Sequence, residues 1–293
     1  MAWLGIRLTV PSERIERLSD ALLELGAQSV ALRDAADAPV FEPAPGETPW
    51  WPRVDVDALF ELDADTAVIR ARLDADFPLE VESVDVRFVE DADWSRTWRE
   101  HAPVRRFGER LWIVPRDASA TIRDGVVLRL DPGLAFGTGG HATTALCLEW
   151  LATHRIDRWS VVDYGAGSGI LAIAALLLGA DRAVAIDHDP QALVATRTNA
   201  TYNGVAAHRL TVSAPDELPT TPHDLVLANI LAGPLTTLAP TLTRWLKPGG
   251  RLVMSGMLTH QVDAVLAHYP EIRFESAQVC DSWAMVEGTK AVV

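Results

Sequence analysis

The 293-residue chain is poor in cysteine and has no long hydrophobic run. Cys147 and Cys280 allow at most one disulfide, so stability cannot rest on a disulfide framework, and a reducing cytoplasmic setting is expected. The longest unbroken apolar run spans nine residues, 170–178, whereas a membrane-spanning helix needs about 20. Arg7 interrupts the first apolar stretch, and no small-residue cleavage site follows it, which argues against a secretory signal.

Basic side chains are in the minority, with 26 Lys and Arg against 40 Asp and Glu, for a net charge of −14. Nucleic acid and anionic membranes both require a basic footprint, so neither is expected as a direct partner. The acidity is uneven, because residues 1–92 contain 20 acidic and 8 basic side chains and the remaining 201 contain 20 and 18. An acidic first third is typical of a solvated surface or of a docking face for a basic protein.

The first third has the pattern of a small α+β domain of the ferredoxin-like βαββαβ type. We expect one helix capped by Ser12 and stopped by Gly26, and a second at about 65–73. Four strand-like runs lie around these helices, at 3–10, 28–33, 54–62 and 81–90. Five prolines between 34 and 53 predict a loop. In that loop, Trp50 and Trp51 either pack on the sheet or contact a partner.

The rest of the chain alternates strand-like and helical lengths, which predicts a doubly wound α/β domain with a mainly parallel sheet. Apolar strand-like runs occur at 161–164, 183–186, 224–228 and 251–255. Two late strands, 272–279 and 283–287, are expected to pair with each other, and one of them is expected to be antiparallel to the rest of the sheet. The predicted organisation is a first domain at 1–92, a connector at 93–125 that includes Trp94, Trp98 and Trp112, and an α/β domain at 126–293.

A glycine-rich turn, Gly165-Ala-Gly-Ser-Gly169, follows the first buried strand of this α/β domain. Glycines allow close approach of a ligand, and the N-terminus of the next helix adds unpaired N–H groups. The spacing is G-x-G-x-G, which disfavours nicotinamide or flavin binding; a purely structural turn is the alternative. The next strand ends in Asp187, where a carboxylate can accept hydrogen bonds from both hydroxyls of a ribose. Asp189 fits the cap of the following helix better than Asp187, so Asp187 is left for the ribose. The glycine turn and this acid together predict an adenosine ligand.

These residues resemble the class I S-adenosylmethionine-dependent methyltransferases. Two further stretches narrow the resemblance, DPGLAFGTGGHATT at 131–144 and ANILAGPL at 228–235. Together they are similar to the PrmA family, the methyltransferases of large-subunit ribosomal protein L11. The resemblance covers essentially the whole chain. It implies a protein methyltransferase that moves methyl groups from S-adenosylmethionine to lysine side chains and the N-terminal amine of ribosomal protein L11.

The resemblance also implies which residues contact S-adenosylmethionine. They are Thr144, Gly165, Asp187 and Asn229, with Thr138 and Gly167 as neighbouring loop residues. His141 is either a base or, in the favoured interpretation, a residue that orders its loop through hydrogen bonds. No catalytic acid or base and no metal site is assigned, because alignment alone can supply about 7 kcal/mol or more. The required deprotonation of a lysine costs about 4 kcal/mol near pH 7.4. The positive charge of the sulfonium lowers the pKa of the amine and with it this cost.

The uneven charge predicts a division of labour, in which the first domain recognises the basic ribosomal protein and the α/β domain binds the cofactor. The connector is either a hinge that presents several amines in turn or a rigid helix packed by its tryptophans. Two other classes of function fit the same residues. One is a methyltransferase of the same fold with another substrate, and the other is a binding module that retains the nucleoside site without turnover.

Overall fold

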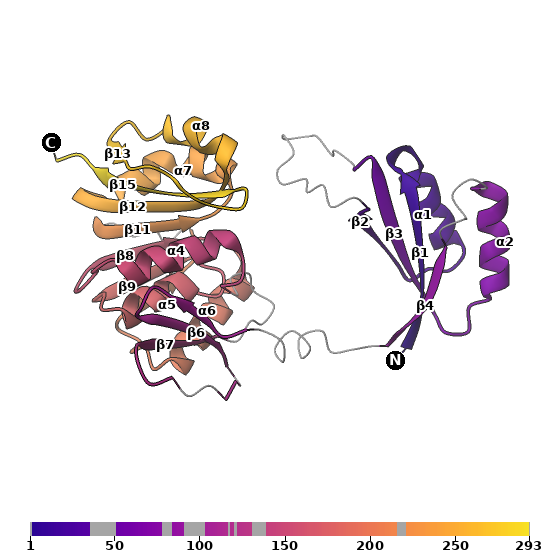
Figure 1. The fold of residues 1–293 in the computed structure, drawn as a ribbon, viewed down its shortest axis with the longest axis horizontal. Helices are drawn as coiled ribbons and strands as arrows, with labels where there is room; N and C mark the ends of the chain where they lie inside the picture. Colours follow the sequence, from indigo (N-terminus) through magenta and orange to yellow (C-terminus); the bar gives the residue numbers. More distant parts are fainter. Residues whose placement is uncertain are drawn as a thin grey trace. The chain divides into compact units, whose positions relative to one another are not determined.

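The computed structural model describes residues 2–35, 51–77, 84–90, 103–116, 118–119, 122–130, 139–215 and 221–292. The chain divides into two compact units, Met1–Asp93 and Trp94–Val293, and each is described by itself (Figure 1). Among the described residues, no helix is long and apolar enough to span a membrane. Cys147 is buried, Cys280 is exposed, and both thiols are free.

The N-terminal unit is a four-stranded antiparallel sheet with two helices on one face (Figure 1). Its strands lie in the order β2-β3-β1-β4. Their bounds are β1 (Ala2–Pro11), β2 (Ser29–Asp34), β3 (Arg53–Phe60) and β4 (Asp85–Glu90). Alternate residues of β1 and β3 point into the core with α1 (Ile15–Glu24) and α2 (Thr66–Asp76). Element order and pairing together give the ferredoxin-like arrangement that the sequence predicts.

The helix ends of this unit agree with the sequence prediction except at Ser12 and at the end of α2, which runs to Asp76 and not to 73. Ser12 was expected to cap α1, and this is wrong, because it lies in the 3₁₀ turn η1 (Ser12–Arg14) and makes no side-chain cap bond. Gly26 ends α1 with a φ of +97°, and Asp65 caps α2 by accepting from the backbone N–H groups of residues 67 and 68. Trp51 packs against the core of the unit, whereas Trp50 lies outside the described residues.

The C-terminal unit is built on an eight-stranded sheet, seven of whose strands lie in the order β10-β9-β8-β11-β12-β15-β13. The first five pair in parallel. They are β8 (Ser160–Tyr164), β9 (Arg182–Ile186), β10 (Leu210–Ser213), β11 (His223–Asn229) and β12 (Leu246–Leu258). The mainly parallel, doubly wound sheet is therefore confirmed.

Alternate residues of these strands enter two cores, one on each face of the sheet. One core contains α4 (Ala142–Thr153) and α5 (Ile170–Leu177), with α6 (Pro190–Tyr202) at its margin. The other contains α7 (Ala232–Arg244) and α8 (Val262–Leu266). Burial on both faces explains why the strands read as unbroken apolar runs.

The two C-terminal strands pair with each other, and one of them is antiparallel to the rest of the sheet, as predicted, but the first of them is divided. The stretch 272–279 forms two short strands, β13 (Ile272–Phe274) and β14 (Gln278–Cys280). Both pair antiparallel with β15 (Trp283–Lys290), which also pairs antiparallel with β12. Residues 275–277 separate them, because β14 pairs with the start of β15 and β13 with its end.

A three-stranded sheet that sequence analysis did not foresee precedes the large one. It consists of β5 (Arg105–Phe107), β6 (Leu111–Pro115) and β7 (Val126–Leu130). Its buried side chains, among them Leu111, Ile113 and Leu128, join the core of α4 and α5. Much of the stretch 93–125, expected as a connector, therefore belongs to the folded C-terminal unit. Residues 93–102, with Trp94 and Trp98, lie outside the described residues.

Candidate functional site

The candidate residues gather at the carboxyl ends of neighbouring parallel strands. Gly165 and Gly167 follow β8, Asp187 follows β9, and Asn229 ends β11. From β8, the chain continues outward through β9 and β10 and then returns to the other side of β8 with β11. Such a reversal of strand order opens a crevice, and ligands of open α/β sheets bind there.

The glycine-rich turn needs glycine for reasons of backbone and space. Gly165 has a φ of +75°, and a Cβ at this position would lie 2.3 Å from Cγ2 of Ile230. Gly169 has a φ of +79°, and its Cβ would lie 2.7 Å from Cγ2 of Thr196. Both positions therefore exclude larger residues, and the turn delivers the chain into α5 with backbone N–H groups at the carboxyl edge of the sheet.

Asp187 fastens this turn to the end of β9. Its Oδ2 accepts a hydrogen bond of 2.8 Å from the backbone N–H of Gly167, and its Oδ1 accepts one of 3.0 Å from that of Asp189. Asp189, not Asp187, caps α6 by accepting from the N–H of Gln191. Each carboxylate oxygen has two lone pairs, so Asp187 can accept further bonds from a ligand while it holds the turn.

Thr144 and Asn229 are joined directly, although 85 residues separate them in sequence. The amide Nδ2 of Asn229 donates to Oγ1 of Thr144 over 3.1 Å. This bond uses only the amide nitrogen of Asn229, so among the described residues its Oδ1 stays available as an acceptor, while Thr144 is almost fully buried in the first turn of α4. The structure therefore brings Thr144 and Asn229 into direct contact, and it joins Asp187 to the neighbouring loop residue Gly167.

His141 caps α4, the loop-ordering role that sequence analysis favours. Its Nδ1 accepts from the backbone N–H of Thr143 and lies 2.8 Å from Oγ1 of the same residue. The ring also meets Trp283 edge-on, with centroids 5.0 Å apart. Thr138 and the rest of the stretch 131–138 lie outside the described residues.

Three polar residues that sequence analysis did not single out hold the glycine-rich turn and the start of α5 through hydrogen bonds. Oγ1 of Thr196 donates to the carbonyl of Gly167, and Nδ2 of Asn199 donates to that of Ser168. Asp163, fully buried in β8, accepts from the N–H of Ala172, and burial raises its pKa from the ordinary 3.8 to about 7. The available signal was a carboxylate in the buried strand, two residues before the glycine-rich turn, together with two polar residues three apart on one helix.

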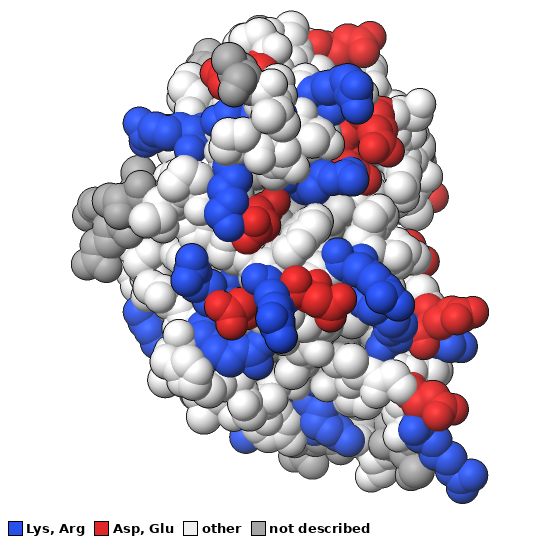
Figure 2. All heavy atoms as spheres, turned by 90° about the vertical axis from the view of Figure 1, so that its left-hand side faces the viewer, with Lys and Arg blue, Asp and Glu red and all other residues white. Residues whose placement is uncertain are grey.

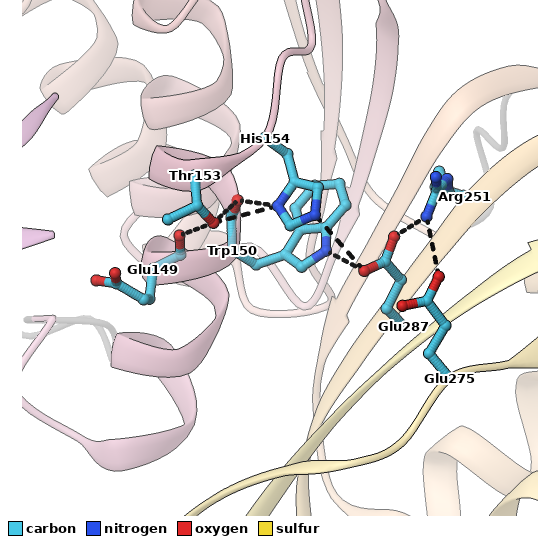
Figure 3. A network of polar contacts seen from close by, with 7 residues as sticks. All are labelled: Glu149, Trp150, Thr153, His154, Arg251, Glu275 and Glu287. Atoms are coloured by element: carbon cyan, nitrogen blue, oxygen red, sulfur yellow. Dashed lines mark hydrogen bonds and ion pairs between the residues drawn. The ribbon is translucent and has the colours of Figure 1, made fainter. Parts of the chain in front are cut away.

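A network of polar contacts ties the far end of α4 to β12 and β15 (Figure 3). Buried Glu287 of β15 accepts from Nε1 of Trp150 over 2.7 Å and pairs with Arg251 of β12. His154, just after α4, stacks on Trp150 and lies 3.8 Å from the same carboxylate. These contacts fix α4 against the sheet, and α4 carries Thr144 and His141 at its opposite end.

The profile of a family described as ribosomal protein L11 methyltransferase (PrmA) matches residues 2–291. A ribosomal protein L11 methyltransferase of Ectopseudomonas mendocina (strain ymp) is 48% identical over 291 residues, covering 99% of this chain and all of the relative. One of Azotobacter vinelandii is 49% identical over 292 residues, with the same coverage.

Among solved structures, a ribosomal protein L11 methylase from Lactobacillus delbrueckii subsp. bulgaricus is similar with a TM-score of 0.58 and 31% sequence identity. The match covers 64% of this chain and 99% of that one.

Proposed function

The chain belongs to the ribosomal protein L11 methyltransferase family, and from this premise we propose that it transfers methyl groups from S-adenosylmethionine to amines of ribosomal protein L11. The acceptors we propose are lysine side chains and the N-terminal amine. The observation that carries the proposal is the site itself. A glycine turn fastened by Asp187 stands beside a hydrogen-bonded Thr144–Asn229 pair at the switch point of the sheet.

The cofactor would lie along this edge, with its ribose near Asp187 and its methionine end near Thr144. Charge-assisted bonds from ribose hydroxyls to a carboxylate are worth about 1.5–3 kcal/mol each. Gly165 and Gly167 lie at this edge, and their lack of a side chain would let the cofactor approach the backbone closely. The family position Thr138 remains part of the proposed site on the strength of its sequence alone.

Methyl transfer at a sulfonium needs a neutral amine held in line with the carbon–sulfur bond. The Asn229 amide is locked by its bond to Thr144, so its oxygen is a fixed acceptor for one N–H of the incoming amine. That bond would orient the nitrogen lone pair toward the methyl group. The reaction then needs alignment more than acid–base catalysis, which agrees with the use of His141 as a helix cap.

The N-terminal unit would recognise the protein substrate. Residues 1–92 carry a net charge of −12, whereas the remaining residues carry −2, and ribosomal proteins are generally basic. Their docking should weaken as salt rises, because screening shortens the range of the attraction. The C-terminal unit would hold the cofactor and the reacting groups.

Nucleic acid and membrane are not part of the proposal, and the cytoplasm is the proposed compartment. Figure 2 views the C-terminal unit from the side on which β15 ends, where the parallel strands begin. Basic side chains on this side are interspersed with acidic ones. Lys247 lies 2.7 Å from Asp224, and Lys290 lies 3.9 Å from Glu271. Such paired charges do not form the continuous basic stripe that a phosphate backbone requires.

Radiolabelled S-adenosylmethionine tests the proposal. Incubated with the enzyme and unmodified ribosomal protein L11, it should pass label to that protein. Label in another protein or in a small molecule instead would indicate a different methyltransferase. Calorimetric binding of the cofactor without any transfer would indicate a binding module.

A further inference from the structure

We infer that His141 and Trp283 form an aromatic wall for the target amine, and that Trp283 selects lysine by contacting its aliphatic stem. The inference rests on the proposed function and adds a specificity-determining residue to it. Its basis is the position of the two rings at the carboxyl edge of the sheet, beside the pair that would hold the amine.

The two rings are in direct contact. Their centroids are 5.0 Å apart and their planes meet at 69°, so the edge of one ring faces the other. His141 is exposed and Trp283 is half-buried, which leaves the pair partly open to solvent. Aromatic pairs of this geometry are favourable beyond the area that they bury, so the wall is an ordered surface.

The wall lies next to the proposed reaction centre. His141 is the residue before α4, and Thr144 lies three residues later in the first turn of that helix. Thr144 in turn bonds Asn229. Trp283 begins β15 and pairs with Leu258, the last residue of β12. Asn229 pairs with Ser255 of the same strand, so Trp283 stands just beyond the carboxyl end at which Asn229 projects.

Helix α4 and strand β15 are also joined at the ends that lie away from the wall. Trp150, near the end of α4, bonds Glu287 of β15 (Figure 3). His141, before the start of α4, meets Trp283 at the start of β15. Two separated attachments between one helix and one strand fix their relative position. The distance between the wall and Asn229 is thereby set by the fold instead of by the ligand.

The chemistry of the wall suits an alkyl amine. A lysine would lay its four methylenes along the indole while the nitrogen reaches Asn229. The nitrogen gains positive charge as the carbon–nitrogen bond forms and the carbon–sulfur bond breaks. The negative face of tryptophan attracts such a cation, more strongly than other aromatic rings do. An N-terminal amine has no such stem and would gain less from the indole.

The test compares lysine and N-terminal methylation within one substrate. Wild type and Trp283→Leu are incubated with ribosomal protein L11 and S-adenosylmethionine, and methylation at each amine is followed by peptide mass mapping. The variant should lower kcat/KM at lysine about fivefold to tenfold, and less at the N-terminus. Trp283→Phe, which keeps an aromatic face, should restore much of the lysine activity.

Two controls separate substrate contact from general damage. The cofactor Kd of Trp283→Leu, measured by calorimetry, should stay within about twofold of wild type, since the wall is not placed against the cofactor. Trp112→Leu removes a half-buried indole of β6 and should leave the lysine to N-terminus ratio unchanged. An unchanged ratio in Trp283→Leu, or equal losses at both amines, overturns the inference. If wild type methylates no amine of this substrate, the proposed function itself fails.

Discussion

Replacing Asp187 by alanine should damage both the cofactor site and the turn that builds it. The carboxylate accepts from the N–H groups of Gly167 and Asp189, and the side chain is only 9% exposed, so alanine leaves two largely shielded donors unpaired. Two such losses should lower the free energy of unfolding by about 1–3 kcal/mol. Loss of two bonds to ribose hydroxyls adds about 3–6 kcal/mol to the binding free energy, a rise in cofactor Kd of at least about 100-fold.

Urea unfolding and calorimetry measure the two effects separately. Asp189→Ala is the matched control, because it removes the cap of α6 in the same turn, at about 1 kcal/mol of stability, without touching the ribose position. Asp187→Ala should therefore differ from Asp189→Ala mainly in cofactor Kd. A folded Asp187→Ala variant that binds S-adenosylmethionine like wild type would refute the assignment of Asp187 to the ribose.

Four other changes have distinct expected outcomes. Asn229→Ala should lower methyl transfer about 100-fold in steady-state assays while circular dichroism stays native, and normal turnover would remove Asn229 from the reaction centre. A chain starting at residue 94 should keep its calorimetric cofactor affinity but lose methylation of ribosomal protein L11; full activity would contradict substrate recognition by the first unit. Burial raises the pKa of Asp163 to about 7, so wild-type stability should fall as pH rises from about 4 to 7, and Asp163→Asn should flatten that slope in urea titrations. Glu287→Ala should cost about 2–3 kcal/mol in urea unfolding, whereas exposed Glu275→Ala should cost under about 0.5.

Most of the site could be predicted from sequence because its parts are local. A buried strand, a glycine turn and an acid at the end of the next strand stand within 27 residues, from 161 to 187. Parallel strands bring their carboxyl ends together, so the side chains after β8, β9 and β11 had to share one edge. The bond between Thr144 and Asn229 follows from no local pattern, since it depends on how α4 packs across the sheet.

The misjudged elements are those whose partners are distant in sequence. β6 pairs in parallel with β7 and relies on α4 and α5 for burial, so its five residues alone do not reveal a sheet. The stretch 272–279 has strand-forming residues at both ends, and β15 pairs with it in two pieces. Ser12 has the right chemistry for a cap, but the turn after β1 places it before the helix starts. In each case tertiary packing decided between alternatives of similar local propensity.

We propose that the carboxyl edge of this sheet delivers methyl groups to amines of ribosomal protein L11. Peptide mass mapping of that protein, after incubation with the purified enzyme and S-adenosylmethionine, tests this proposal. We expect added methyl groups on lysine side chains and the N-terminal amine, and about 100-fold slower addition by Asn229→Ala under the same conditions. An unmodified ribosomal protein beside an enzyme that binds its cofactor would contradict it.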